Sequence, residues 1–142
     1  MADDAPYLVR LGDAQADAVS ALFDVLQRAE WHLCTVDYRK AGSIAEVDVN
    51  ITKADGTAGL QEPSGPLLLA LKRLRDLMAS EEGRPWLSVT VTARPDGRVS
   101  FDYNYDQRPR WSLEPTDESY IEDLARYPRL ADQLPEWYPR PS

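Results

Sequence analysis

Apolar side chains recur every three to four positions in two long stretches, which is the spacing of one buried helix face. The first stretch predicts a helix over residues 13–30, with Asp13 as its N-cap. The second predicts a helix that begins at Ser64, has Pro66 in its first turn and ends at Gly83. Serine suits an N-cap, the first turn does not need the N–H that proline lacks, and glycine commonly ends a helix.

Alternating apolar and polar residues predict two β-hairpins. The first hairpin joins strands over residues 31–39 and 43–52, and the second joins strands over residues 87–92 and 98–106. Between the first hairpin and the second helix, residues 54–65 are rich in glycine and polar side chains, which predicts a loop. Each hairpin is antiparallel, but the sequence leaves open how the two hairpins join in a sheet.

The C-terminal third predicts a short helix and little other regular structure. Thr116 or Asp117 suits the N-cap of this helix, and Pro128 ends or kinks it. One further turn is predicted shortly after it, and several prolines leave the end of the chain irregular. Trp111 and Trp137 are expected to pack this segment onto the sheet, because tryptophan buries a large area.

The predicted order of elements is α-β-β-α-β-β-α, which is typical of an α+β domain. The length of 142 residues suits a single domain over residues 1–142. We expect a four-stranded, largely antiparallel sheet packed by helices, followed by an irregular C-terminal segment rich in proline and tryptophan. Residues 1–12 and 139–142 are expected to be loosely attached.

The chain is strongly acidic. It has 16 Lys and Arg against 24 Asp and Glu residues, so its formal net charge is −8. Phosphate backbones repel such a chain, which disfavours nucleic-acid binding, whereas a basic protein partner is favoured. No apolar run approaches the ~20 residues of a membrane helix, and the acidic start lacks the pattern of a signal peptide. We therefore expect no membrane contact and a cytoplasmic location.

Residues that commonly carry out catalysis or bind metals form no recognisable motif. His32 is the only histidine and Cys34 the only cysteine, so a zinc site lacks further ligands and no disulfide can form within the chain. Asp102 and Asp106 are about 13 Å apart on one predicted strand, which is too far for one metal ion. We therefore expect a protein that is not an enzyme and that binds neither a cofactor nor a metal.

The predicted strands have one apolar and one polar face. If the apolar face packs under the helices, the other face of the sheet is rich in acids. Its residues are Asp37, Glu46, Asp48, Asn50, Thr90, Asp102, Asn104 and Asp106. Exposed faces of antiparallel sheets are commonly plain solvated surface, but a rigid acidic face can also attract a basic partner. The residues alone leave both interpretations open.

Ordered motifs in residues 99–138 resemble those of a known family. They are Phe101-Asp102-Tyr103-Asn104-Tyr105-Asp106, Pro109-x-Trp111, Tyr120-x-x-Asp123-Leu124, Tyr127-Pro128-Arg129 and Pro135-Glu136-Trp137-Tyr138. This set resembles the YezG-like family of immunity proteins, small bacterial antitoxins encoded beside polymorphic or LXG-type secreted toxins. The resemblance implies a protein that binds a cognate toxin domain and neutralises it by steric and electrostatic blocking, without chemistry.

An acidic protein of this kind fits a basic nuclease as the toxin, with an NAD-degrading toxin as the alternative. The expected partner-binding residues are Asp102, Asn104, Tyr105, Asp106, Trp111, Glu114 and Glu118. Their carboxylates would pair with Arg or Lys of the toxin, and Trp111 or Tyr105 would serve as an aromatic anchor. Two other classes stay open. One is a small enzyme or ligand-binding domain with a cleft lined by Tyr103, Tyr105 and Trp111, and the other is a secretion chaperone with a larger exposed apolar patch.

Overall fold

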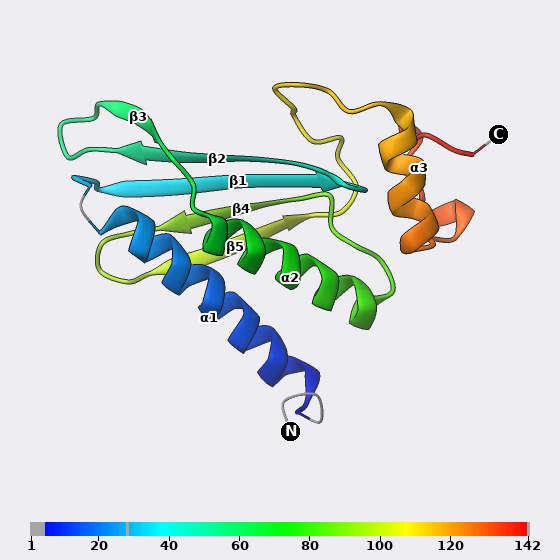
Figure 1. Cartoon of the computed structure of the whole chain (residues 1–142), viewed down its shortest axis with the longest axis horizontal. Helices are drawn as coiled ribbons and strands as arrows, with labels where there is room; N and C mark the ends of the chain where they lie inside the picture. Colours follow the sequence, from blue (N-terminus) through cyan, green and yellow to red (C-terminus); the bar gives the residue numbers. More distant parts are fainter. Residues whose placement is uncertain (1–4, 28, 142) are drawn as a thin grey trace.

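The computed structural model of the protein describes residues 5–27 and 29–141 and confirms an α+β fold (Figure 1). Its helices are α1 (Tyr7–Leu26), α2 (Gly65–Glu82) and α3 (Asp117–Arg126), followed by a 3-10 turn, η2 (Ala131–Gln133). Its strands are β1 (Leu33–Ala41), β2 (Ile44–Thr52), β3 (Ala58–Gln61), β4 (Ser88–Ala93) and β5 (Val99–Asn104). The expectation of four strands is wrong, because the described residues form a sheet of five.

The strands form one antiparallel sheet in the order β3-β2-β1-β4-β5. Both predicted hairpins are present, and β1 joins them because it pairs with β4 as well as with β2. Helices α1 and α2 lie side by side across one face of the sheet, whereas α3 lies beyond one end, beside the β1–β2 turn (Figure 1). We call the opposite face of the sheet the outer face.

The fifth strand, β3, lies within residues 54–65, which the composition predicted as a loop. A tight turn precedes it: the Lys53 N–H donates to the Thr57 carbonyl oxygen at 2.8 Å, and Gly56 has a φ of 88°, which favours glycine. Strand β3 then pairs with β2 over its four residues. Its side chains are mostly exposed, so no alternation of apolar and polar residues marks the strand, and backbone pairing stabilises it instead.

Helix α1 begins at Tyr7, earlier than the predicted start at Asp13. Contacts with the C-terminal end of α2 explain the earlier start. The Tyr7 hydroxyl donates a hydrogen bond to Glu82 at 3.0 Å, and Arg10 forms an ion pair with Glu81. These contacts stabilise a first turn that the apolar stripe alone does not mark.

The predictions for the two ends of the chain are corrected in part. Helix α1 ends at Leu26, before the predicted end. Residues 7–12, which were expected to be loose, are helical, and residues 139–141 have no regular secondary structure. The remaining terminal residues expected to be loose include 1–4 and 142, which lie outside the described residues.

Helix α2 begins and ends as predicted. The Ser64 hydroxyl oxygen accepts a hydrogen bond from the Leu67 N–H at 3.2 Å, and Pro66 lies in the first turn. Gly83 ends the helix with a φ of 81°. The apolar stripes of α1 and α2 pack on the sheet and form the main core. Its buried residues include Leu22, Leu26, Val36, Val49, Leu71, Leu74, Trp86, Val89 and Val91.

Two buried charges connect α2 to α3. The Arg75 guanidinium donates two hydrogen bonds to the Asp123 carboxylate, at 2.8 Å and 2.9 Å, and the two side chains are 0% and 3% exposed. Arg75 also donates to the carbonyl oxygens of Trp86 at 2.7 Å and Lys40 at 3.2 Å. A buried ion pair needs such additional hydrogen bonds, because burial removes both charges from water.

The β1–β2 turn fits closely against α3. Gly42 has a φ of 60°, and its N–H donates to Asp123 at 3.3 Å. A Cβ atom at position 42 would lie 2.6 Å from the Ser119 carbonyl oxygen. Both the backbone conformation and the available space therefore require glycine here. The same carboxylate that binds Arg75 thus also positions this turn.

The residues after β5 pack around α3 in a second apolar cluster. Its buried members are Ala41, Leu87, Tyr120 and Tyr138, with Trp111, Leu124, Leu134 and Trp137 partly buried against them. The Trp111 indole N–H donates to the Tyr120 hydroxyl oxygen at 2.9 Å. The Trp137 N–H donates to the Asp106 carbonyl oxygen at 2.8 Å. The two tryptophans therefore attach the C-terminal segment to α3 and to the end of the sheet.

We predict that Asp123→Asn destabilises the protein by about 3–5 kcal/mol, because it leaves the Arg75 charge buried without its counter-charge. Urea unfolding followed by circular dichroism measures this change. The control is Lys72→Gln, which breaks the Lys72–Asp76 pair at the surface of α2, the helix that carries Arg75. This variant should lower the free energy of unfolding by less than about 1 kcal/mol. Equal losses in the two variants would contradict the role assigned to the buried pair.

Candidate functional site

Polar residues form cross-strand rows on the outer face. Paired residues of neighbouring strands point to the same face, so the register of the sheet defines each row. One row, which we call the acidic row, consists of Asp48, Asp37, Thr90 and Asp102. The row beside it consists of Glu46, Arg39, Ser88 and Asn104. The strands that carry the predicted polar face therefore place its residues together, with Asp106 as the exception.

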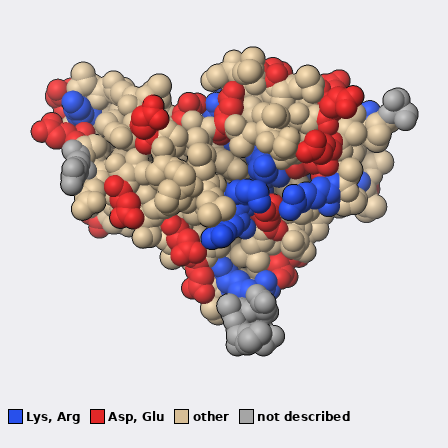
Figure 2. All heavy atoms as spheres, viewed as in Figure 1, with Lys and Arg blue, Asp and Glu red and all other residues tan. Residues whose placement is uncertain are grey.

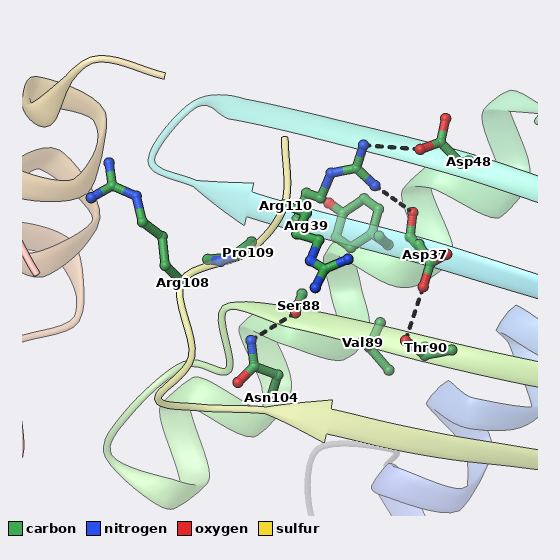
Figure 3. A pocket seen from close by; sticks show the side chains of 11 residues that line it. Asp37, Arg39, Asp48, Ser88, Val89, Thr90, Asn104, Arg108, Pro109 and Arg110 are labelled. Atoms are coloured by element: carbon green, nitrogen blue, oxygen red, sulfur yellow. Dashed lines mark hydrogen bonds and ion pairs between the residues drawn. The ribbon is translucent and has the colours of Figure 1, made fainter. Parts of the chain in front are cut away.

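Asp37 and Asp48 are direct neighbours in the acidic row, on β1 and β2. Like charges directly opposite each other destabilise a sheet, so this pair needs compensation. The Arg39 guanidinium binds Asp48 at 2.9 Å, and the Thr90 hydroxyl donates to Asp37 at 2.9 Å (Figure 3). Asp102, at the end of the row, is exposed. The row therefore holds more negative charge than these contacts neutralise.

Arg39 lies in the middle of the outer face, although the acidic pattern did not single it out. Its side chain is buried and binds Glu46 at 2.6 Å as well as Asp48. Burial acts to lower the pKa of Arg39, but the hydrogen bonds that it donates to the two carboxylates raise the pKa above its ordinary value. The sequence does indicate that Arg39 lies on the outer face, because Arg39 follows Asp37 by two positions and alternation along a strand places both side chains on one face.

Residues 107–113, which we call the covering segment, run over one end of the outer face. The Glu46 carboxylate fastens this segment, since it accepts hydrogen bonds from the N–H groups of Ser112 and Leu113, both at 2.8 Å. Burial acts to raise the pKa of Glu46, but these two bonds and the bond from Arg39 lower it below its ordinary value. Glu46 thus connects the sheet to a segment far away in the sequence.

A cavity of about 480 Å³ lies between the covering segment and the outer face (Figure 3). Its walls are Asp37, Tyr38, Arg39, Asp48, Ser88, Val89, Thr90 and Asn104 of the sheet and Arg108, Pro109 and Arg110 of the covering segment. Both members of the like-charged pair line it. The cavity is therefore polar and charged, whereas sites for small molecules are commonly lined by apolar side chains.

Two exposed apolar side chains border this part of the outer face. Leu113 is 80% exposed and Ile44 is 42% exposed. Alternation along β2 places Ile44 on the same face as Glu46, and the Glu46 carboxylate binds the Leu113 N–H. Both apolar side chains therefore lie close to one carboxylate. Apolar anchors surrounded by polar groups are typical of protein interfaces.

Of the seven predicted partner-binding residues, Asp102 and Asn104 lie on the outer face. The Asn104 amide donates to the Ser88 hydroxyl oxygen at 2.9 Å. Its amide oxygen accepts hydrogen bonds from the N–H groups of Gln107 at 2.9 Å and Asp106 at 3.3 Å. Such a turn around an asparagine ends β5 and redirects the chain. The prediction that Asp106 shares a strand face with Asp102 is therefore wrong.

Asp106 and Tyr105 have partners away from the outer face. Asp106 lies 3.5 Å from Arg84 and 3.5 Å from Arg129. The Tyr105 hydroxyl donates to Glu82 at 2.7 Å, and the Arg84 guanidinium lies 4.6 Å from the centre of the Tyr105 ring. Burial and the neighbouring Glu82 carboxylate raise the pKa of Tyr105. Tyr105 thus lies at the C-terminal end of α2.

The other predicted residues lie near α3. Trp111 packs in the second apolar cluster. Glu114 pairs with Arg108 at 2.5 Å, and Glu118 is exposed in the first turn of α3. The seven predicted residues are therefore distributed over three places: the outer face, the end of α2 and the surroundings of α3.

The aromatic residues of the expected ligand cleft pack in two separate clusters. Tyr103 and Tyr105 pack against the main core, whereas Trp111 packs around Tyr120. The Tyr103 hydroxyl oxygen also accepts a hydrogen bond from Gln15 of α1 at 2.8 Å. Tyr103 and Tyr105 therefore fill space on the helix-covered side of the sheet, whereas Trp111 fills space beside α3.

A group of positive charges also lies around Asp76 of α2. Figure 2 shows Lys and Arg side chains close together near the middle of this view. Lys72 pairs with Asp76 at 3.0 Å, and the Tyr127 hydroxyl donates to the same carboxylate at 2.7 Å. Lys40 and Arg126 lie near Asp76 as well. Lys40, Lys72 and Arg126 therefore surround the Asp76 carboxylate.

Cys34 and His32 lie apart from the outer face. Cys34 is buried in the core, and burial raises the pKa of its thiol to about 11. His32 is exposed just before β1. Within residues 5–27 and 29–141, no group of three His, Cys, Asp or Glu side chains lies close enough to hold a metal ion. No helix in the same part of the chain has the length and hydropathy to cross a membrane.

No family model and no curated protein matches this chain.

We predict that the covering segment loosens in acid. The folded-state pKa of Glu46 lies below its ordinary value of 4.5. The stabilisation from Glu46 is therefore complete above about pH 4.5 and is lost as the pH falls through the lowered pKa. The amide NMR signals of Ser112 and Leu113 should shift with a midpoint below that value. Glu46→Gln cannot ionise and should abolish this transition, so an unchanged transition in the variant would contradict the assignment.

Proposed function

We propose that the protein is an immunity protein that binds a cognate toxin domain through the outer face of its sheet. The observation that carries this proposal is the acidic row, in which Asp37 and Asp48 are direct neighbours and Asp102 is exposed. Like charges in such positions lower the stability of a sheet. A role in binding a basic partner therefore accounts for the row better than a role in folding.

The row is suited to capturing a positively charged protein. Its carboxylates stand on three strands of one hydrogen-bonded sheet, so their positions are fixed before the partner arrives, and little conformational entropy is lost on binding. The excess of negative charge in the row also attracts a positively charged surface over distances of about a Debye length and speeds association. Fast capture suits an inhibitor that must act before its toxin does.

Apolar contact would come from Leu113 and Ile44 beside the row. Charges mainly provide steering and specificity, whereas buried apolar side chains near the centre of an interface provide much of its affinity. Leu113 replaces Trp111 as the expected anchor, because Trp111 is already packed around Tyr120. A standard interface of about 800 Å² per partner can include the outer face together with the covering segment. Inhibition would then be steric and would need no chemistry.

The resemblance of residues 99–138 to YezG-like immunity proteins identifies the proposed partner as a toxin domain. A basic nuclease is the favoured toxin, since proteins that bind phosphate backbones do so with Lys and Arg, and these side chains complement the acidic row. An NAD-degrading toxin is the alternative. In either case the protein is proposed to act in the cytoplasm of the cell that produces it.

A second candidate function is the binding of a small polar ligand. The cavity of about 480 Å³ has a volume within the range of small-molecule sites, about 300–1,000 Å³. Its charged walls favour a polar ligand over the apolar ligand expected from an aromatic cleft. Protection of cells against a toxin is expected of an immunity protein and not of a protein that binds a small ligand, so this measurement separates the two candidates.

The proposal is tested by co-expressing the protein with the toxin domain encoded beside its gene. The wild-type protein should restore growth, and the purified pair should form a complex. We predict that Asp37→Asn combined with Asp48→Asn slows association by about tenfold at low salt, because steering by the row is lost. Stopped-flow fluorescence at several salt concentrations measures this rate.

The matched control is Asp13→Asn combined with Asp24→Asn. Both of these acids are exposed on α1, so the control removes the same charge from a different surface. Equal slowing in the two double variants would show that net charge matters and the row does not. No rescue by the wild-type protein would argue against the immunity function itself.

A further inference from the structure

The side chain of Arg110 reaches from the covering segment into the charged cavity (Figure 3). The backbone that follows it is fastened to the sheet, because the Glu46 carboxylate accepts hydrogen bonds from the N–H groups of Ser112 and Leu113, two and three residues further along the chain. Pro109 beside it is buried. The position from which Arg110 enters the cavity is therefore set by the fold, whereas its long side chain is free to change rotamer.

Arg110 differs from the two other arginines of the cavity walls. Arg39 pairs with Glu46 at 2.6 Å and with Asp48 at 2.9 Å. Arg108 pairs with Glu114 at 2.5 Å, and its guanidinium lies 5.3 Å from the centre of the Trp137 ring. Arg110 forms no ion pair with the described residues. Its charge compensates the acidic row only at longer range, without a bond that holds it in place.

We propose that this cavity receives a basic side chain of the protein partner and that Arg110 occupies it in the unbound protein. The inference rests on the proposed function and names the recognition chemistry of the same face. A guanidinium already enters the cavity, so the cavity has the size and charge for an arginine of a partner. The Asp37 carboxylate is the candidate acceptor, because it lines the cavity and the described residues supply it with one partner, the neutral hydroxyl of Thr90.

Competition between the two cations follows from this arrangement. When a partner arginine enters, Arg110 turns out to solvent, because its guanidinium is not held by an ion pair with the described residues and is repelled by the incoming charge. Arg39 stays in place, since Glu46 and Asp48 bind it. In the free protein the same side chain lowers the repulsion within the acidic row. Arg110 therefore stabilises the unbound protein and opposes binding, whereas a residue that contacts the partner would favour binding.

The experiment uses an amidated tetra-arginine peptide as the probe, titrated into the purified protein at low salt and followed by NMR. Arg110→Ala is compared with Arg98→Ala. The Arg98 side chain is 76% exposed, and the ion pair that it forms with the described residues is with Asp96 in the β4–β5 turn. Both variants therefore remove one positive charge. We predict that Arg110→Ala binds the peptide about two- to fivefold more tightly than Arg98→Ala, which corresponds to losing one exposed competing charge.

Equal affinities of the two variants would overturn the inference, and so would weaker binding by Arg110→Ala, which would make Arg110 a contact residue. In the wild-type protein, the Arg110 Nε–H signal should move on peptide addition while the Arg98 signal stays in place; the absence of that movement would also overturn it.

A third variant separates this inference from the proposed function. Asp37→Asn combined with Asp48→Asn should weaken peptide binding. If it does so while Arg110→Ala matches Arg98→Ala, only the role of Arg110 is wrong. If the double variant binds the peptide as the wild type does, the outer face does not receive basic side chains, and both proposals lose their basis.

Discussion

The buried ion pair between Arg75 and Asp123 determines how the parts of this protein are arranged. Arg75 also bonds to carbonyl oxygens of β1 and of the segment before β4, and Asp123 also binds the N–H of Gly42 in the β1–β2 turn. One pair of side chains therefore joins α2, two parts of the sheet and α3. Because both groups are removed from water, a displacement of α3 leaves a charge without compensation. This penalty makes the position of α3 specific, where apolar packing alone tolerates alternatives.

The position of α3 in turn determines the structure of the outer face. Residues 105–116 connect β5 to α3, so the end of β5 and the start of α3 fix where this connection begins and ends. Its path over the sheet is then fastened by Glu46, which binds Ser112 and Leu113. A buried pair on one side of the sheet thereby positions a segment on the other side. The cavity exists because these two attachments are satisfied together.

Alternation along the strands predicted most of the outer face correctly, because the face of a residue depends only on its neighbours in the chain. Asp106 was misplaced because the side chain of Asn104 forms a turn that ends β5, and a regular pattern does not reveal where it stops. The pairing of Asp37 with Asp48 and the association of β1 with β4 depend on register, which the sequence left open. The Arg75–Asp123 pair, between residues 48 positions apart, has no local signal at all.

The charges of this protein differ in how completely they are satisfied, and this difference separates fold from function. Arg75 and Asp123 are each bound from several directions and buried, so neither is available to another molecule. Arg39 is likewise held by two carboxylates. The Asp37 carboxylate has one neutral partner among the described residues, Asp102 is exposed, and Arg110 lines the cavity without an ion pair to the described residues. Charges of the first kind stabilise the fold, and replacing their partners would destabilise the protein. Charges of the second kind can exchange one partner for another with little loss of stability. An interface that must form quickly and specifically is best built from the second kind on a scaffold held by the first.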